Sequence, residues 1–208
     1  MTLRERKQRR TRDTIVEAAI VLFAERGFDA VTITDIAHRA EIGRATFFRY
    51  FADKQEVLFA DDTELLATLV AAIEASAATL ATLGESLANA LVVARAGLLA
   101  LTRRVTTQPD RLALRARLID AHPDLQARNL VKERGYTEAA VAAMTRHGAA
   151  RDTAELAASL AAACFATGHA RALATGQDLP SAVDAAFRTL TLLDTAVLRA
   201  GLDGQGTA

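Results

Sequence analysis

Alanine makes up more than a fifth of this chain, 47 of its 208 residues, while proline occurs only three times. Alanine is the best helix former and is poor in strands. The composition therefore predicts an all-α protein and argues against sandwiches, barrels and doubly wound sheets. Because 51% of the residues are hydrophobic and the acidic and basic residues balance at 25 each, we expect a packed core and not a disordered chain.

Several classes of protein have no support in the sequence. One cysteine rules out a disulfide framework, and four scattered histidines lack the spacing of metal ligands. No apolar run approaches the ~18 residues of a transmembrane helix, and the first ten residues lack the apolar core of a signal peptide. No GxSxG, HExxH or glycine-rich phosphate loop occurs. We therefore expect a soluble, cytoplasmic protein that is not an enzyme, makes no membrane contact and holds neither metal nor cofactor.

Helical periodicity is clearest in the first 60 residues. Between Thr11 and Arg26 an apolar stripe recurs at helical spacing and Gly27 is placed to end the helix. The stripe is formed by Ile15, Ala18, Ala19, Leu22 and Phe23. Thr32 with Asp35 has the spacing of a capping box, which predicts a short helix at about 33–40. After the three-residue break at 41–43, a second short helix is predicted at about 44–51.

The remaining chain is also predicted to be helical. Asp53 with Glu56 forms a second capping box and opens a long helix at about 54–81. Gly, Pro and cap residues then delimit helices at about 85–106, 110–121, 124–147, 153–175 and 181–200, and Asp152 is the predicted cap of the helix at 153–175. Glycines mark residues 201–208 as a disordered tail.

Two short helices joined by a three-residue break have the pattern of a helix-turn-helix unit. The second helix of such a unit enters the major groove of DNA, where arginine can bridge guanine O6 and N7 and a threonine methyl can contact thymine. Arg44 and Thr46 lie at the start of that helix. Phe47 and Phe51, four residues apart, are expected on its inward face, with Phe23 and Phe28 as partners.

The positive charge is concentrated in residues 1–12, where six cationic side chains oppose Glu5 alone, a net charge of +5. Cations near DNA phosphates release condensed counterions, so a basic arm at a chain end is a common nucleic-acid device. A solvated flexible tail is the alternative explanation.

Residues 8–60 resemble the DNA-binding domain of the TetR family of transcriptional regulators. The resemblance lies in TIVEAAIVLFAERGFDAVTITDIAHRA and in RATFFRYFADKQEVL. It implies a basic arm at 1–12, a three-helix DNA-binding domain at 13–55, and a helical domain at 56–200 that binds an effector and forms a homodimer, about nine helices in all.

The resemblance also implies roles for single residues. Arg44 and Thr46 would contact base edges, with Thr34 adding a contact from the preceding helix. Lys54, Arg49 and Tyr50 would bind phosphates, and Thr32 would direct its helix N-terminus at the backbone. The chain departs from the family pattern at four positions, because Glu41 and Ala45 replace glycine, Gly43 replaces serine, and Phe48 replaces a phosphate-binding tyrosine. Phe48 stays among the expected DNA-binding residues by its position.

For the C-terminal domain the resemblance implies a dimer interface over about residues 153–200. Small residues that suit close helix packing lie there, namely Ala158, Ala162, Ala166, Ala170, Ala185 and Ala186. Packing within one chain is the alternative. The candidate effector-binding residues are Asn89, Arg95, His122, Tyr136, Met144, Cys164, Phe165 and His169. For each of them, an ordinary role in the core or on the surface is the stronger alternative.

The sequence thus predicts a ligand-responsive transcriptional regulator, most simply a repressor that a small-molecule effector releases from operator DNA. The alternative is a helical ligand-binding or scaffold protein whose operator binding is weakened by the changes at Glu41, Gly43 and Phe48.

Overall fold

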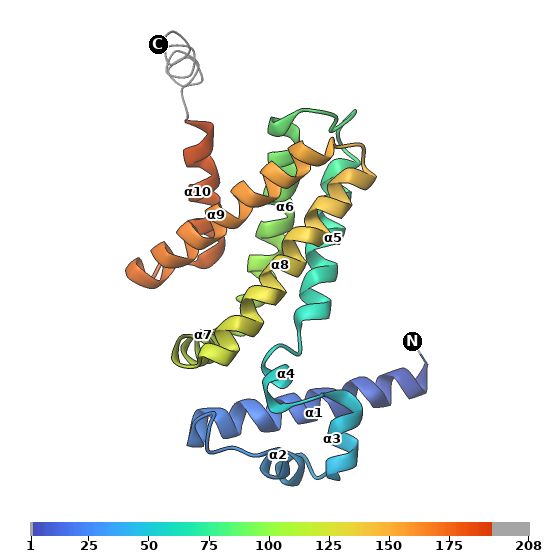
Figure 1. The fold of residues 1–208 in the computed structure, drawn as a ribbon, viewed down its shortest axis with the longest axis vertical. Helices are drawn as coiled ribbons and strands as arrows, with labels where there is room; N and C mark the ends of the chain where they lie inside the picture. The colour runs from blue at the N-terminus through green and yellow to red at the C-terminus, as the bar shows by residue number, and fades with distance from the viewer. Residues whose placement is uncertain (1, 193–208) are drawn as a thin grey trace. The chain divides into compact units, whose positions relative to one another are not determined.

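The structure is a computed structural model and describes residues 2–192. Over this range the chain forms ten α-helices and no strand, only one isolated bridge between Gly84 and Ala149, which confirms the all-α prediction (Figure 1). The helices are α1 (Leu3–Arg26), α2 (Ile33–Arg39), α3 (Arg44–Tyr50), α4 (Lys54–Leu58), α5 (Asp62–Ala77), α6 (Leu87–Val105), α7 (Pro109–Ala121), α8 (Pro123–Arg146), α9 (Arg151–Thr175) and α10 (Leu179–Thr191). None of them is both long enough and apolar enough to cross a membrane.

The described chain divides into two compact units. The first contains residues up to 67 together with 105–135, and the second contains 68–104 and the residues from 136 onward. The division falls inside α5 and again inside α8, so continuous helices lead from one unit into the other.

The first unit has a core built from the predicted apolar stripe of α1. Phe23 and Phe28 pack together there with ring centroids 5.0 Å apart. Phe47 and Phe51 are also buried in this core, which confirms that they face inward. Leu118 of α7 and Leu125 of α8 complete the same core, a contribution from more than 50 residues further along the chain.

Two predicted helix boundaries, the start of α2 and the end of α1, are confirmed by the structure. The Thr32 hydroxyl accepts from the Asp35 amide while the Asp35 carboxylate accepts from the Thr32 amide, so the capping box at the start of α2 is confirmed. Gly27 ends α1 with φ +80°, a backbone conformation that glycine adopts without steric cost.

The predicted single helix at about 54–81 is wrong, because the chain turns between α4 and α5. Phe59 and Ala60 are buried at this turn, and the Arg12 guanidinium donates to the Ala60 carbonyl that the break exposes. No glycine or proline marks the break. It arises because Phe59 must enter the core of the first unit, which is a tertiary requirement.

The second unit is a helical bundle in which small residues allow close approach. A Cβ on Gly97 of α6 would lie 2.6 Å from the Ile73 side chain of α5, and one on Gly168 of α9 would meet the Val183 backbone of α10 at the same distance. Ion pairs add to this packing, from Arg146 to Glu74 and from Arg95 to Asp184.

Two boundaries in this unit differ from prediction or lie beyond the description. Asp152 does not cap α9, because the helix already begins at Arg151 after Ala150, and no side chain caps it. The end of the helix predicted at 181–200 and the predicted tail at 201–208 fall outside the described residues.

Candidate nucleic-acid interface

The turn between α2 and α3 contains Glu41 with φ +53°, the one non-glycine residue between 2 and 192 with positive φ. This left-handed conformation costs an L-residue about 1 kcal/mol, which explains why glycine suits this place. Gly43 then forms the N-cap of α3 without a side-chain hydrogen bond. The turn of the helix-turn-helix unit therefore forms at a cost in free energy, from the backbone strain at Glu41 and the missing cap at Gly43.

The side chains predicted to meet base edges lie on the outside of this unit. Arg44 and Thr34 are exposed and Thr46 is half-buried. Within residues 2–192 no carboxylate pairs with the Arg44 guanidinium. Its five N–H donors are free for a bidentate contact with a base.

Phe48 is 48% exposed, although its neighbour Phe47 is fully buried. The two rings meet edge to face with centroids 5.7 Å apart, so the packed ring orients the exposed one. The outward position fits an expected role at the DNA surface, and that role stays a prediction.

Thr32 is exposed at the N-terminus of α2, where it was predicted to direct the helix toward a phosphate. The Thr32 hydroxyl and amide both donate to Asp35 and hold the pKa of that carboxyl below its ordinary value. Asp35 therefore stays charged at neutral pH next to the predicted phosphate position, with Arg26 3.7 Å away as a partial counter-charge.

Lys54 is engaged inside the protein. Its ammonium donates to the Phe28 carbonyl at 2.8 Å and to the Val31 carbonyl at 3.0 Å, and it lies 4.4 Å from the centroid of the Phe28 ring. The ammonium thus holds the α1–α2 loop against the start of α4. A phosphate at this lysine would compete with these carbonyls, and the phosphate contact stays a prediction.

The C-terminal half of α3 carries the other two predicted phosphate ligands. The Arg49 guanidinium lies 5.3 Å from the Tyr50 ring centroid, and no carboxylate in the described part of the chain pairs with it. Tyr50 is half-buried against the core of the first unit.

The predicted effector-binding residues are divided between the two units. His122 lies in the first unit, where its ring meets Phe28 edge to face at 5.1 Å and its Nε2 lies 3.4 Å from an Asp29 carboxylate oxygen. The other candidates lie in the second unit. There, His169 stacks on Phe165 with centroids 5.8 Å apart.

The remaining effector candidates have partners or are buried within the second unit. Arg95 pairs with Asp184, and the Asn89 amide donates to the Thr82 carbonyl at 3.1 Å. Met144 is fully buried, and burial raises the pKa of the Cys164 thiol, so the thiol is neutral at physiological pH. Tyr136 is half-buried at the start of this unit's part of α8. The effector site stays a prediction.

Sequence reasoning missed the contacts that α7 and α8 make with the DNA-binding part of the first unit. The Arg128 guanidinium of α8 donates two hydrogen bonds, of 2.9 and 2.7 Å, to the Asp53 carboxylate. The same carboxylate caps α4 by accepting from the Glu56 amide. No local signal could have revealed this, because the partners are 75 residues apart in the sequence.

Comparison with known proteins agrees with this architecture. A family model described as "Bacterial regulatory proteins, tetR family" matches residues 15–60. The regulator TcmR of Streptomyces glaucescens is 40% identical over 72 residues, 35% of this chain, and the match spans only 32% of TcmR. The transcriptional regulator MftR of Mycobacterium tuberculosis is 32% identical over 148 residues, which is 71% of each protein.

A solved structure extends the likeness over nearly the whole chain. FadR of Thermus thermophilus, a TetR-family repressor solved with lauroyl-CoA, is 26% identical and covers 88% of this chain and 95% of its own, with a TM-score of 0.54. These relatives are transcriptional regulators and not enzymes, in agreement with the prediction from the sequence. The match to MftR, together with the helix-turn-helix unit formed by α2 and α3, shows that the chain belongs to the TetR family of bacterial regulatory proteins.

Proposed function

We propose that this protein is a ligand-responsive repressor that binds operator DNA as a homodimer and is released by a small-molecule effector. The observation that carries the proposal is the outer face of α3, where the unpaired Arg44 and the exposed Phe48 lie one helical turn apart on the second helix of a helix-turn-helix unit. As part of the same proposal, the protein acts on the chromosome, in the cytoplasm.

The mechanism is a shift between populations of the dimer. The two copies of α3 in a dimer can enter successive major grooves when their separation matches about one helical turn of DNA, ~34–36 Å. An effector that binds better to a dimer with another separation draws the population away from DNA. By linkage, operator DNA must weaken effector binding by the same factor.

The effector and the dimer contacts are assigned to the second unit. FadR of Thermus thermophilus was solved with lauroyl-CoA, a precedent for a ligand in this fold. The dimer is proposed to form through about residues 153–200, which include α9 and α10, because Ala162, Ala166 and Ala170 recur at four-residue spacing on α9 with exposed side chains. Exposed small residues let a second helix approach closely.

The test is selection of duplex DNA by the full-length protein from a random pool, followed by Arg44→Ala. We expect enrichment of a two-fold symmetric sequence. The variant should lose ~1–3 kcal/mol of operator affinity and relax its preference at one base pair per half-site. Arg117→Ala removes an exposed arginine from α7 and serves as the control. A uniform loss on every sequence would make Arg44 a phosphate contact.

A second candidate is a helical ligand-binding or scaffold protein with weakened operator binding. The specific observations in its favour are the positive φ of Glu41, the missing side-chain cap at Gly43 and the absent hydroxyl at Phe48. Failure to enrich any sequence, together with only weak non-selective DNA binding, would favour this candidate over the repressor.

A further inference from the structure

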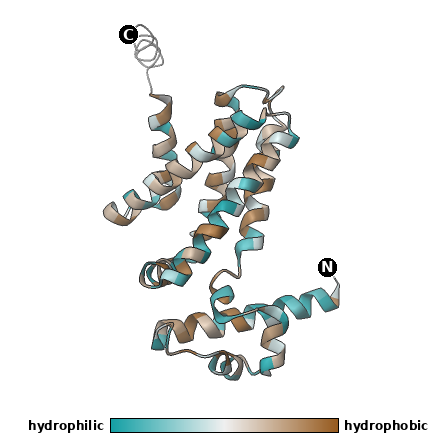
Figure 2. Cartoon of the chain, in the orientation of Figure 1, coloured by the Kyte–Doolittle hydropathy of each residue, from teal (hydrophilic) through white to brown (hydrophobic). Residues whose placement is uncertain are grey.

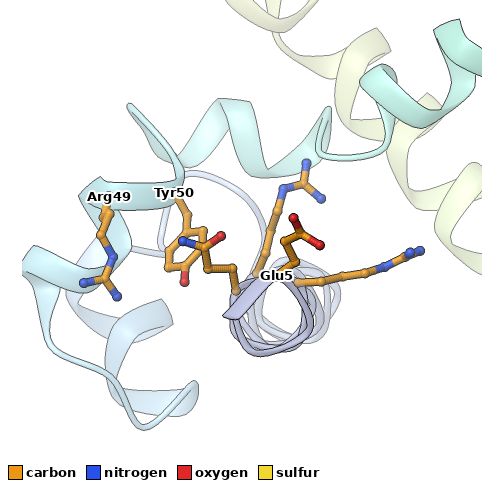
Figure 3. A pocket seen from close by; sticks show the side chains of 6 residues that line it. Glu5, Arg49 and Tyr50 are labelled. Carbon is orange, nitrogen blue, oxygen red and sulfur yellow. The ribbon is translucent and has the colours of Figure 1, made fainter. Parts of the chain in front are cut away.

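An open pocket of about 470 Å³ lies between the beginning of α1 and the end of α3 (Figure 3). Arg49 and Tyr50 form one wall, and residues of the basic arm, among them Glu5, form the other. Arg49, Tyr50 and the arm already have expected roles at DNA phosphates. His122 of the same unit is predicted only as an effector contact, and its contacts with the α1–α2 loop have no part in the proposed DNA binding.

The backbone of His122 is fixed at the junction of α7 and α8. Its amide donates to the Ile119 carbonyl, and its carbonyl accepts from the Leu125 and Gln126 amides in the first turn of α8. The side chain is only 22% exposed, and its ring packs edge to face against the buried Phe28 ring. The imidazole therefore has little freedom to turn away from the α1–α2 loop.

The hydrogen bonds of the imidazole determine which nitrogen carries the proton. Nδ1 lies 2.8 Å from the Leu118 carbonyl, which can only accept, so Nδ1 is the protonated nitrogen of the neutral ring. Nε2 then presents a lone pair to an Asp29 carboxylate oxygen 3.4 Å away. Two acceptors face each other while the imidazole is neutral, and protonation of Nε2 turns the same contact into an ion pair.

Asp29 belongs to the loop that joins α1 to α2, the first helix of the helix-turn-helix unit. Figure 2 shows that α1 is hydrophilic in its first turns and more hydrophobic toward this loop. Phe28 and Val31 of the loop are buried, and the Lys54 ammonium donates to both of their carbonyls. The Asp29 side chain is 87% exposed, so its contact with His122 depends on charge and not on burial.

The other charged groups around the imidazole are of both signs. Asp120 of α7 and Asp124 of α8 lie within two residues of His122 in the sequence. The Lys54 ammonium of α4 lies 4.4 Å from the centroid of the Phe28 ring and opposes a second positive charge there. The charged residues at the end of α1 pair with residues of α2, in the ion pairs Arg26–Asp35 and Glu25–Arg39. Asp29 is thus the group that a protonated Nε2 meets at ion-pair distance.

We propose that His122 is a pH-sensitive clamp on the α1–α2 loop. When Nε2 is protonated it binds Asp29 and fixes the loop to the α7–α8 junction, and when Nε2 loses its proton the loop loses this anchor. The stability that the pair contributes is therefore present in mildly acidic solution and is lost as the pH rises through the titration of the imidazole. Because α2 begins at Ile33, directly after the loop, the clamp sets how firmly the helix-turn-helix unit is held.

The clamp should also strengthen operator binding in mildly acidic solution, an effect that rests on the proposed function. A loop that is already fixed has less conformational entropy to lose when the helix-turn-helix unit binds DNA. This gain in affinity should disappear at a pH where the imidazole is neutral.

A double-mutant cycle with His122→Asn and Asp29→Asn tests the clamp by chemical denaturation of the full-length protein. His122→Asn keeps a donor at the position of Nδ1 and removes Nε2, whereas Asp29→Asn removes only the charge. At pH 5.5, below the ordinary pKa of a histidine side chain of ~6.5, the unfolding equilibrium constant should show a coupling of about two- to five-fold, the range for exposed ion pairs. At pH 8 the coupling should vanish.

The control is the same cycle with His38→Asn and Asp13→Asn, which change exposed residues of α2 and α1 and should show no coupling at either pH. A cycle reports only the interaction between the two residues, so a general loss of stability in one variant cancels. Equal coupling at pH 5.5 and pH 8, or none at pH 5.5, would overturn the clamp.

Operator binding is measured at the same two pH values, with a duplex that the wild type selects. Relative to wild type, we expect the affinity of both His122→Asn and Asp29→Asn to be several-fold lower at pH 5.5 than at pH 8. Asp29→Asn retains the histidine charge, so a loss confined to His122→Asn would mean that the imidazolium attracts DNA directly, and it would overturn the effect of the clamp on binding. If no duplex is selected, the proposed function fails, and the double-mutant cycle still decides the clamp.

Discussion

Neighbouring side chains on α3 have different tasks. Phe47 is fully buried and holds the helix to the core, whereas Phe48 is 48% exposed and free to meet a ligand. Changing Phe47 would therefore alter stability, and changing Phe48 should alter recognition. Lys54 combines both kinds of role. Its ammonium donates to backbone carbonyls within the protein, and it is also predicted to contact a DNA phosphate.

Phe48→Tyr should tighten operator binding several-fold to tenfold. The new hydroxyl can donate to a phosphate, and a hydrogen bond to a charged group contributes ~1.5–3 kcal/mol before desolvation is subtracted. The specificity ratio and the salt slope should stay the same, since tyrosine adds no charge. Operator titrations and thermal melts check this. A lowered melting temperature with unchanged affinity would show that the ring serves packing instead.

Lys54→Met should lower the free energy of unfolding by ~1–3 kcal/mol, because methionine retains the apolar stem and loses the bonds to the Phe28 and Val31 carbonyls. Chemical denaturation measures this loss. The salt dependence of DNA binding in the same variant tests the predicted phosphate contact. A slope shallower by about one unit would support that contact, and an unchanged slope would limit Lys54 to its internal role.

At the level of elements, the helix starts in the DNA-binding part differ in strength. α2 begins with a complete capping box, whereas α3 begins at Gly43 with no side-chain cap. α4 is only five residues long, and Asp53 both caps it and binds Arg128 of α8. A helix this short depends on such external contacts, since isolated short helices are unstable in water.

Asp53→Asn should destabilise the protein at neutral pH and have little effect in acid. Burial opposes ionisation, but hydrogen bonds from Arg128 and the Glu56 amide outweigh it and hold the pKa of Asp53 below its ordinary value. The carboxylate therefore contributes stability above the unfolded pKa of ~3.9, and this contribution is lost as the pH falls through the folded pKa. Because Asp53 is partly exposed, we expect a difference of only about 1 kcal/mol at pH 7.

Unfolding curves of Asp53→Asn and wild type at pH 7 and pH 3 measure this difference. Asparagine can still cap α4, so the comparison isolates the ion pair with Arg128. A pH-independent difference would assign the effect to geometry and not to charge.

At the level of the whole molecule, the proposed function requires two copies of the chain. Ala162→Glu/Ala166→Glu places charges on the exposed small-residue face of α9 and should give monomers that bind a full operator poorly. Ala127→Glu/Ala142→Glu, at exposed positions of α8, is the matched control and should remain dimeric. Sedimentation velocity gives the answer, provided that circular dichroism stays helical. A folded dimer of the first variant would place the interface elsewhere.

The sequence by itself determined the all-α class, the short helices at 33–40 and 44–51 and the inward faces of Phe47 and Phe51. These features depend on local capping, on helix propensity and on apolar residues at helical spacing, all of which are visible within a few turns. The family resemblance over residues 8–60 rested on the same ordered spacing, and the match to residues 15–60 confirms it.

Tertiary structure alone decided the break between α4 and α5, the internal bonds of Lys54, the grip of Arg128 on Asp53 and the pocket between α1 and α3. Each depends on groups that are distant in the sequence, so no local pattern reveals them. Phe59 turns the chain because it is buried in a core that includes residues from α1 and α7, and Arg9 reaches Glu64 because both residues lie in the first unit. Local sequence sets which helices form, whereas the burial of distant side chains sets where they stop and which charges meet.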